Sequence, residues 1–279
     1  MIQFTEVQFG YSRTKNVFRN LSFTISPGHI YGLLGKNGAG KTTMLKLISG
    51  LVFPHGGTIR CAGLKPGNRE PEWLAGMFVV PETFSLPNIS ASEFGRIYGA
   101  FYPHFSQSQF VANLSGWNID PGKNCKKLSL GEKQKVMIAF ALATGVNYLF
   151  LDEPVAHMDI LSKTVFRKML AEALDDDRLI MLSTHMVRDL DSLIDHVLVL
   201  DEGRLVVDRS LDEIDSRLSF GRANTVTSED KILWSSDEAF AGSVITENLS
   251  GIPGKVDMEL LFQAAIQSPH IFDAVLTRK

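Results

Sequence analysis

The chain has 279 residues, of which 44% are hydrophobic and 21% are charged, and its formal net charge at pH 7 is -3. This composition is typical of a globular protein with one large domain, or one domain and a small appendage, and it excludes a disordered or fibrous chain. It also argues against a strongly basic surface for nucleic acid, because phosphate binding depends on clustered Lys and Arg side chains.

The first residues, 1–10, have the pattern of a strand and lack the basic and then apolar segments of a signal peptide. No uninterrupted apolar run approaches the roughly 20 residues that span a bilayer. The two cysteines, Cys61 and Cys125, do not have the spacing of a zinc or redox pair, which favours a reduced cytosolic compartment. We therefore expect any action at a membrane to go through a partner protein.

Short apolar runs recur along the chain and predict the strands of a parallel sheet. Such runs, bounded by polar residues or glycine, suit strands covered on both faces, and they lie at 30–34, 77–80, 148–151, 179–182 and 197–200. Helix-period stretches lie between them, such as 160–174. Strands that alternate with helices predict an α/β fold with a mostly parallel sheet.

One region that departs from this alternation lies at about 85–130. It has helix-like patterns rich in aromatic side chains, interrupted by Pro103, and it predicts an inserted helical subdomain. Aromatic residues at helical spacing are more often part of a core, but an exposed aromatic groove would suit a protein partner.

A second departure begins after about residue 217, where the composition shifts toward Ser, Thr and Gly. Strand candidates lie at 231–234 and 243–247, and an amphipathic helix is expected at about 257–267. We therefore predict a main domain over 1–217 and a small α+β extension over 218–279.

The segment 35–42, Gly-Lys-Asn-Gly-Ala-Gly-Lys-Thr, matches the phosphate-binding pattern G-x-x-x-x-G-K-[ST] between a predicted strand and a predicted helix. Its glycines let backbone N–H groups face the phosphates, and the helix N-terminus adds partial positive charge. We expect Lys41 to reach the β- and γ-phosphates and the Thr42 hydroxyl to ligate Mg²⁺. The residues predicted to hold ATP here are Gly35, Asn37, Gly38, Ala39, Gly40, Lys41, Thr42 and Thr43.

Two acids, Asp152 and Glu153, follow the apolar run 148–151. Burying ionised carboxylates is costly, so their position at the end of a buried strand needs a reason. Asp152 can hold Mg²⁺, directly or through water, and Glu153 can polarise the attacking water. Alone, the pair is equally compatible with the N-cap of the next helix, but the phosphate loop upstream favours the catalytic interpretation.

The segment 127–134, Lys-Leu-Ser-Leu-Gly-Glu-Lys-Gln, resembles the L-S-G-G-Q signature of ABC ATPases. With the phosphate loop, the Asp-Glu pair and Leu-Ser-Thr-His at 182–185, its order and spacing are similar to that family over about residues 1–209. The chain thus resembles an ABC transporter nucleotide-binding subunit of the bacterial exporter type. The resemblance implies a P-loop NTPase core with a mostly parallel sheet, an N-terminal antiparallel β subdomain, a helical insert and a small C-terminal appendage.

The resemblance also implies roles for residues outside the phosphate loop. Ser129 and Gly131 take the place of residues that close over the γ-phosphate bound by the other subunit, so that ATP lies in a dimer interface. His185 corresponds to a switch histidine, Asp159 to an aspartate that communicates between subunits, and Tyr11 to the aromatic residue that stacks on adenine. Simpler alternatives stay open: Ser129 is also a good N-cap, and His185 and Tyr11 could be ordinary structural residues.

Three positions depart from the family pattern. Leu130 replaces the first signature glycine, where a side chain disfavours a positive φ. Glu82 replaces a glutamine that senses Mg²⁺ and contacts the membrane partner; its carboxylate can still bind the metal, but it adds negative charge beside the triphosphate. The loop 155–159 lacks the usual small residue and leucine. None of these changes removes a catalytic residue, so we expect a working ATPase.

The implied function is an ATPase that drives a separate integral-membrane permease from the cytoplasmic face of the membrane, as a homodimer or a heterodimer with a related ATPase. The alternative is a soluble ABC-type ATPase that acts on ribosomes or nucleic acid. Ribosome-acting relatives usually carry two such domains, and DNA-repair relatives insert coiled coils that the gap from Thr42 to Lys127 is too short to hold. A third class, a P-loop kinase that transfers phosphate to a small molecule, does not explain the 127–134 motif at this spacing. We therefore expect no nucleic-acid partner.

Overall fold

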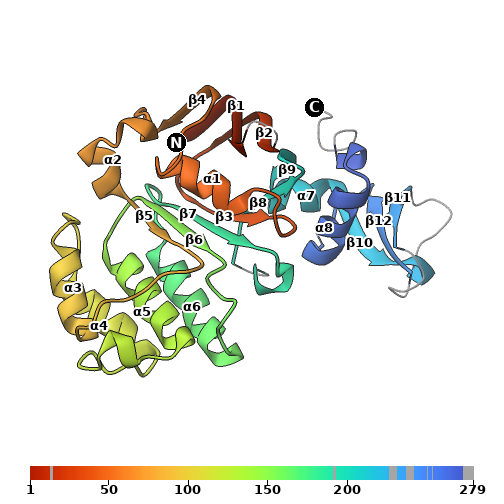
Figure 1. Cartoon of the computed structure of the whole chain (residues 1–279). Helices are drawn as coiled ribbons and strands as arrows, with labels where there is room; N and C mark the ends of the chain where they lie inside the picture. Colours follow the sequence, from red (N-terminus) through yellow and green to blue (C-terminus); the bar gives the residue numbers. More distant parts are fainter. Residues whose placement is uncertain are drawn as a thin grey trace.

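The computed structural model describes residues 1–12, 15–190, 193–225, 231–236, 242–249, 251–252 and 254–272 (Figure 1). Its central sheet consists of β3 (His29–Leu34), β5 (Met77–Val80), β6 (Tyr148–Asp152), β7 (Leu179–Thr184), β8 (His196–Asp201) and β9 (Arg204–Ser210). The strand order is β5-β6-β7-β3-β8-β9, and all neighbours are parallel except β8 and β9. The five predicted apolar runs are the five parallel strands, and the predicted α/β fold is confirmed.

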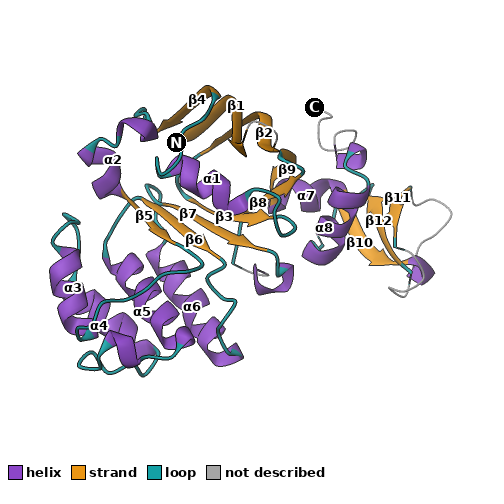
Figure 2. Cartoon of the chain, in the orientation of Figure 1, coloured by secondary structure: helices purple, strands orange, loops and turns teal. Residues whose placement is uncertain are grey.

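A smaller antiparallel sheet covers one face of the central sheet, with α1 (Lys41–Ile48) between the two (Figure 2). It consists of β1 (Ile2–Ser12), β2 (Lys15–Ile25) and β4 (Gly56–Cys61) in the order β2-β1-β4, which confirms the predicted N-terminal subdomain. Inward-facing side chains of β1 alternate with exposed ones. Phe4 from β1, Leu45 from α1 and Phe150 from β6 belong to the apolar core between these layers.

Helices cover the opposite face of the central sheet (Figure 2). They are α3 (Ala91–Gly99), α4 (Gln107–Gly116), α5 (Leu130–Ala143) and α6 (Ile160–Ala173), while the short α2 (Pro71–Gly76) leads into β5. Short 3-10 turns lie at η1 (Pro66–Asn68), η2 (Cys125–Lys127), η3 (Val187–Leu190) and η4 (Ala223–Thr225). A capping box between Ser90 and Glu93 starts α3, because each side chain accepts a hydrogen bond from the other residue's backbone N–H.

The aromatic residues of the helical insert mostly form core. Phe94, Phe110 and Trp117 are buried, and only Tyr98 and Phe101 of the insert's aromatic residues stay exposed. Phe140 of α5 is 1% exposed and gathers the rings of this region. Its centroid lies 4.9 to 6.1 Å from those of its ring neighbours, which are Phe78, Phe94, Tyr102, Phe105 and Phe110. A continuous exposed aromatic groove is therefore not formed by these residues.

The C-terminal part begins with α7 (Leu211–Arg217) and continues as β10 (Leu218–Arg222), β11 (Ile232–Ser235), β12 (Ser243–Glu247) and α8 (Met258–Gln267). The three strands form an antiparallel sheet in the order β10-β12-β11. The predicted strands and helix of this region lie within one residue of β11, β12 and α8. Buried side chains of these elements, such as Ile245 and Leu261, belong to the same apolar cluster as Val199 of β8. The packing is thus continuous across the predicted boundary at residue 217.

Among the helices of the described residues, none has both the length and the apolar content needed to cross a bilayer.

Replacing Phe140 by alanine would leave a cavity where the rings of the insert meet. We expect the free energy of unfolding to fall by about 3–5 kcal/mol. Urea unfolding followed by intrinsic fluorescence measures this change. The matched control is Phe101→Ala: the Phe101 side chain is 72% exposed, so its loss should change the unfolding free energy by less than about 0.5 kcal/mol. Equal losses in the two variants would contradict the described packing.

Candidate functional site

The glycine-rich turn between β3 and α1 forms a cradle at the carboxyl end of the central sheet. Gly35 lies against the backbone of β8, where an added Cβ would be 2.6 Å from the Leu200 carbonyl oxygen. Gly40 caps α1 with a φ of 112°, which a side chain would disfavour. The turn therefore needs glycine at both positions, and it leaves backbone N–H groups at the N-terminus of α1 for an anion.

Lys41 is the first residue of α1, and its side chain folds back over the turn. Its Nζ donates to the carbonyl oxygens of Gly35 at 2.8 Å and Lys36 at 3.4 Å. The same atom lies 3.7 Å from Glu153 Oε1, and both side chains are less than 10% exposed. A buried ammonium held in this way is positioned to bind the terminal phosphates of a nucleotide.

Asp152 ends β6 and points toward the N-terminus of α1. It is 2% exposed and accepts hydrogen bonds from Thr42 Oγ1 at 2.6 Å and from the Ser183 hydroxyl. In-register pairing of β6 with β7 sets Asp152 opposite Ser183. Thr42 and Asp152 thus present adjacent oxygen atoms, which is the kind of ligand that Mg²⁺ prefers.

Glu153 is the first residue after β6, and three groups of Thr184 and His185 contact its carboxylate. Oε2 accepts a hydrogen bond from Thr184 Oγ1 at 3.0 Å, and Oε1 accepts one from the His185 backbone N–H at 3.1 Å. The imidazole Nδ1 of His185 is 2.8 Å from Oε1. Glu153 has a φ of 48°, in the left-handed region, and its own N–H donates to the Ser183 carbonyl oxygen. Glu153 and His185, two of the three residues predicted to be catalytic, are therefore in direct contact, and the third is Lys41.

These residues line one cavity of about 430 Å³. Ten predicted site residues contribute to its wall: Tyr11, Asn37, Gly38, Gly40, Lys41, Thr42, Thr43, Glu82, Glu153 and His185. Tyr11 is 57% exposed, and its hydroxyl is 3.2 Å from Thr43 Oγ1, so its ring stands at the rim. Asp152 and Gly35 lie behind the wall through their contacts with Thr42 and Lys41.

Four predicted residues, Ala39, Ser129, Gly131 and Asp159, do not line the cavity of their own chain. Ser129 is the N-cap of α5: its hydroxyl accepts from Glu132 N, and the Glu132 carboxylate accepts from Ser129 N. Hydrogen bonds from Lys123 and from Ser129 hold the pKa of Glu132 below its ordinary value. The N-cap interpretation of Ser129 is therefore correct, and it leaves the helix tip at the surface.

The structure also places Leu130, Gly131 and Asp159, three further residues of the sequence analysis. Leu130 is the first residue of α5 and does not adopt a positive φ, so replacement of the family glycine causes no strain there. Gly131 permits a close approach to the loop after Glu153, since an added Cβ would lie 2.9 Å from the His157 carbonyl oxygen. Asp159 caps α6 through Ser162, and these hydrogen bonds lower the pKa of Asp159 to about 2.

Comparison with known proteins identifies the family. The family model for the ABC transporter family matches residues 18–156. Nod factor export ATP-binding protein I of Burkholderia lata is 32% identical to this chain over 209 residues, which cover 73% of this chain and 68% of that protein. This chain belongs to the ABC transporter ATP-binding proteins.

Further similarities agree with this family. The ABC transporter ATP-binding protein NatA of Bacillus subtilis is 29% identical over 224 residues, which cover 77% of this chain and 91% of NatA. A solved structure of an ATP binding subunit of an ABC transporter matches with a TM-score of 0.70 at 26% identity, covering 77% of this chain and 91% of that one. The chain is therefore the ATP-binding subunit of an ABC transporter, an ATPase that hydrolyses ATP to drive transport. The family and the function predicted from the motifs are confirmed.

Sequence reasoning missed several residues of this ABC ATPase site. Val17 and Lys36 line the cavity, and the hydroxyls of Ser183 and Thr184 hold the two carboxylates. Ser183 and Thr184 belong to the predicted 182–185 motif. Parallel pairing of the predicted strands 148–151 and 179–182 therefore suffices to place them beside the Asp-Glu pair. Val17 lies on β2, and no local pattern connects that strand to the phosphate loop.

Thr184→Val tests the hydroxyl that links Glu153 to the segment after β7. The Thr184 hydroxyl donates to Glu153 and accepts from Met186 N at 3.0 Å, and Thr184 is 1% exposed. Because valine leaves both groups without this partner, we expect the unfolding free energy to fall by about 1–3 kcal/mol. Denaturant titration of the nucleotide-free chain measures the change. Thr164→Val on the exposed side of α6 is the control, and an equally small effect in both variants would refute the role of Thr184.

Proposed function

We propose that ATP binds in the cradle of one subunit and is closed in by the Ser129 helix tip of a second subunit. Within the cradle, Lys41 contacts the β- and γ-phosphates, Gly35, Asn37, Gly38, Ala39, Gly40, Thr42 and Thr43 surround them, and Tyr11 stacks on adenine. The observation that carries the proposal is the Glu153 carboxylate, held between Lys41 and His185 at the wall of a cavity whose residues do not include Ser129. The Ser129 helix tip therefore reaches this cavity only if a second subunit supplies it, and such a surface would also exclude water.

The charges of the cavity support a role for Mg²⁺. Glu82, Asp152 and Glu153 stand at or beside the wall, so a triphosphate would meet three carboxylates. Thr42, Asp152 and Glu82 offer the oxygen ligands that Mg²⁺ accepts. When bound there, Mg²⁺ would offset this negative charge and that of the phosphates.

Hydrolysis needs a base and a group that orients it. We assign Glu153 as the base that takes a proton from the attacking water and His185 as the residue that contacts the γ-phosphate and fixes that carboxylate. Their contact of 2.8 Å supports this pairing. Ser129 and Gly131 of the second subunit bind the γ-phosphate from the other side, because the capped N-terminus of α5 offers N–H groups and partial positive charge. Asp159 lies in the loop that relays this contact between subunits.

Glu153→Gln should keep the cradle but remove the base. We expect ATP affinity within about threefold of that of the parent chain, hydrolysis slowed by at least about a hundredfold, and a stable dimer in ATP. Calorimetry, phosphate release and light scattering measure these three properties. Lys41→Ala is the matched control, in which ATP binding itself should be lost. If Glu153→Gln stays monomeric in saturating ATP, the two-subunit site is wrong.

The dimer is proposed to drive a separate integral-membrane permease from the cytoplasmic face of the membrane, in the direction of export. Export is supported by the name of the related Nod factor export protein.

Three exposed apolar side chains, Ile97, Tyr98 and Phe101, lie together on the end of α3 and the residues after it. Such a patch is typical of a contact with another protein. Whether the two ATPase subunits are identical depends on the permease.

Purification from native membranes tests the permease. We expect the chain to co-purify with a polytopic protein that stimulates its ATPase rate. Phe101→Ala should lower that stimulation at least about threefold while leaving the basal ATPase rate unchanged, because it removes an exposed side chain of the patch. Glu6→Ala, on the antiparallel sheet, is a surface control. Recovery with ribosomes or DNA in place of a membrane protein would reject the transport assignment.

A further inference from the structure

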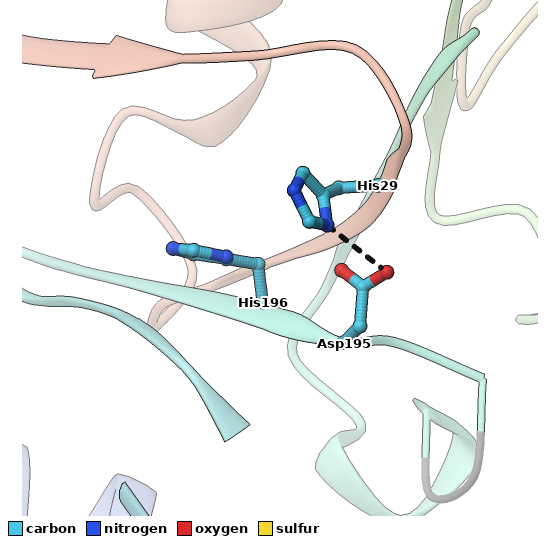
Figure 3. A group of neighbouring side chains, drawn as sticks. All are labelled: His29, Asp195 and His196. Atoms are coloured by element: carbon cyan, nitrogen blue, oxygen red, sulfur yellow. Dashed lines mark ion pairs between the residues drawn. The ribbon is translucent and has the colours of Figure 1, made fainter. Parts of the chain in front are cut away.

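A second group of potential metal ligands lies at the edge of the central sheet opposite to the ATP cradle. His29 is the first residue of β3, His196 is the first residue of β8, and Asp195 precedes it. Because β3 and β8 are parallel neighbours, with Tyr31 paired to His196, their N-terminal ends meet at one edge (Figure 3). The phosphate loop follows the other end of β3, roughly 16 Å away along the strand. The group is therefore separate from the nucleotide site.

The three side chains have the spacing of a metal site. One ligand atom from each residue lies within 4.8 Å of the others. His29 Nδ1 is 3.3 Å from Asp195 Oδ2, as the dashed line in Figure 3 marks. This is already about the separation of two ligands of a tetrahedral ion with bonds of about 2.0 Å. The two imidazole rings lie 5.7 Å apart between centroids, so modest side-chain rotations would bring all three groups around one ion.

Two atoms of the group are shielded from solvent and have no hydrogen-bond partner: Asp195 Oδ1 and His196 Nδ1. Buried polar atoms without a partner are rare and costly. A carboxylate oxygen and an imidazole lone pair are both metal ligands, so a cation would satisfy the two atoms at once.

The residues around His196 indicate which of its two ring nitrogens is free to bind a metal. Its other ring nitrogen, Nε2, is 3.9 Å from Asp208 Oδ1 of β9. This distance is longer than a hydrogen bond, but the negative charge on that side favours the proton on Nε2 and leaves the Nδ1 lone pair for a ligand. The Tyr31 ring, with its centroid 5.0 Å away, packs against the imidazole and restricts its orientation.

We propose that His29, Asp195 and His196 bind a divalent transition metal, Zn²⁺ in particular, with water as the fourth ligand. Two imidazoles and one carboxylate suit Zn²⁺, whereas Mg²⁺ takes oxygen ligands such as those of the ATP cradle. The His29 and Asp195 side chains are 45% and 46% exposed, which gives the ion and its water access. The metal joins the starts of β3 and β8, the two strands whose far ends flank Gly35.

Calorimetric titration of the full chain with ZnSO₄, without nucleotide and in excess Mg²⁺, tests this site. We expect one Zn²⁺ per chain. His29→Gln and His196→Gln each remove a ligand nitrogen but keep a polar side chain, and each should weaken zinc binding by at least about tenfold. Asp208→Asn should weaken it as well, because it removes the negative charge that lies near Nε2.

Two matched controls separate this site from other histidines. His104→Gln, at an exposed residue between α3 and α4, and His185→Gln, in the ATP cradle, should both bind zinc as the parent chain does. ATP binding by His29→Gln and His196→Gln reports that they are folded. Co²⁺ gives a second readout, since the visible absorption of a tetrahedral Co²⁺ site should be lost in His196→Gln.

Three results would overturn the proposal. The first is a parent chain that binds no Zn²⁺ under these conditions. The second is unchanged zinc affinity and stoichiometry in the His29→Gln, His196→Gln double variant while that variant still binds ATP. The third is loss of zinc binding in His185→Gln with retention in His196→Gln, which would place the ion in the ATP cradle.

Discussion

The parallel pairing of β6 with β7 is the constraint on which the proposed catalytic centre depends. It sets Asp152 opposite Ser183, so that the next residues of the two strands, Glu153 and Thr184, meet at the carboxyl edge of the sheet. A slip of one residue would turn each of these side chains to the other face. Glu153 also has a left-handed backbone, which costs about 1–3 kcal/mol for a residue other than glycine. The hydrogen bonds from Thr184 and His185 and the one to Ser183 hold it in that conformation.

The contacts of Lys41 suggest how ATP changes this centre. An ammonium has three donors, and without nucleotide those of Lys41 face the carbonyls of Gly35 and Lys36 and the carboxylate of Glu153. A γ-phosphate competes for the same donors and carries more charge than one carboxylate. We therefore expect nucleotide to draw Lys41 away from Glu153.

The parts of the structure that local patterns encode could be predicted from the sequence. The apolar runs of the parallel strands and the glycine-rich turn each depend on a few consecutive residues, and the structure has them where the patterns indicated. The aromatic insert was ambiguous, because helical spacing alone does not reveal which face of a helix is covered. The rings of the insert pack against Phe140 of α5, which lies after the insert in the sequence.

Other features required knowledge of which distant segments meet. Ser129 illustrates this limit, since the same serine can cap a helix and face the phosphate of a second subunit. The structure shows the cap. Likewise, His29 and His196 are far apart along the chain, and neither stands in a motif; only the adjacency of β3 and β8 brings them to one edge. Both cases depend on tertiary contacts that no window of consecutive residues contains.

The C-terminal extension contacts the ATPase body beside the segment that follows His185. An ion pair and apolar packing both hold it there, and their contributions to stability differ. Arg188 of η3 lies three residues after His185, and its Nε is 2.5 Å from Glu259 Oε1 on α8. The Arg188 side chain is 82% exposed, and an ion pair so open to solvent contributes little to stability. Burial of a single leucine such as Leu261, which is fully buried on the same helix, stabilises by about 1.5–3 kcal/mol. Apolar packing therefore anchors α8 more strongly than the ion pair does, because Leu261 belongs to the same apolar cluster as Val199 of the central sheet.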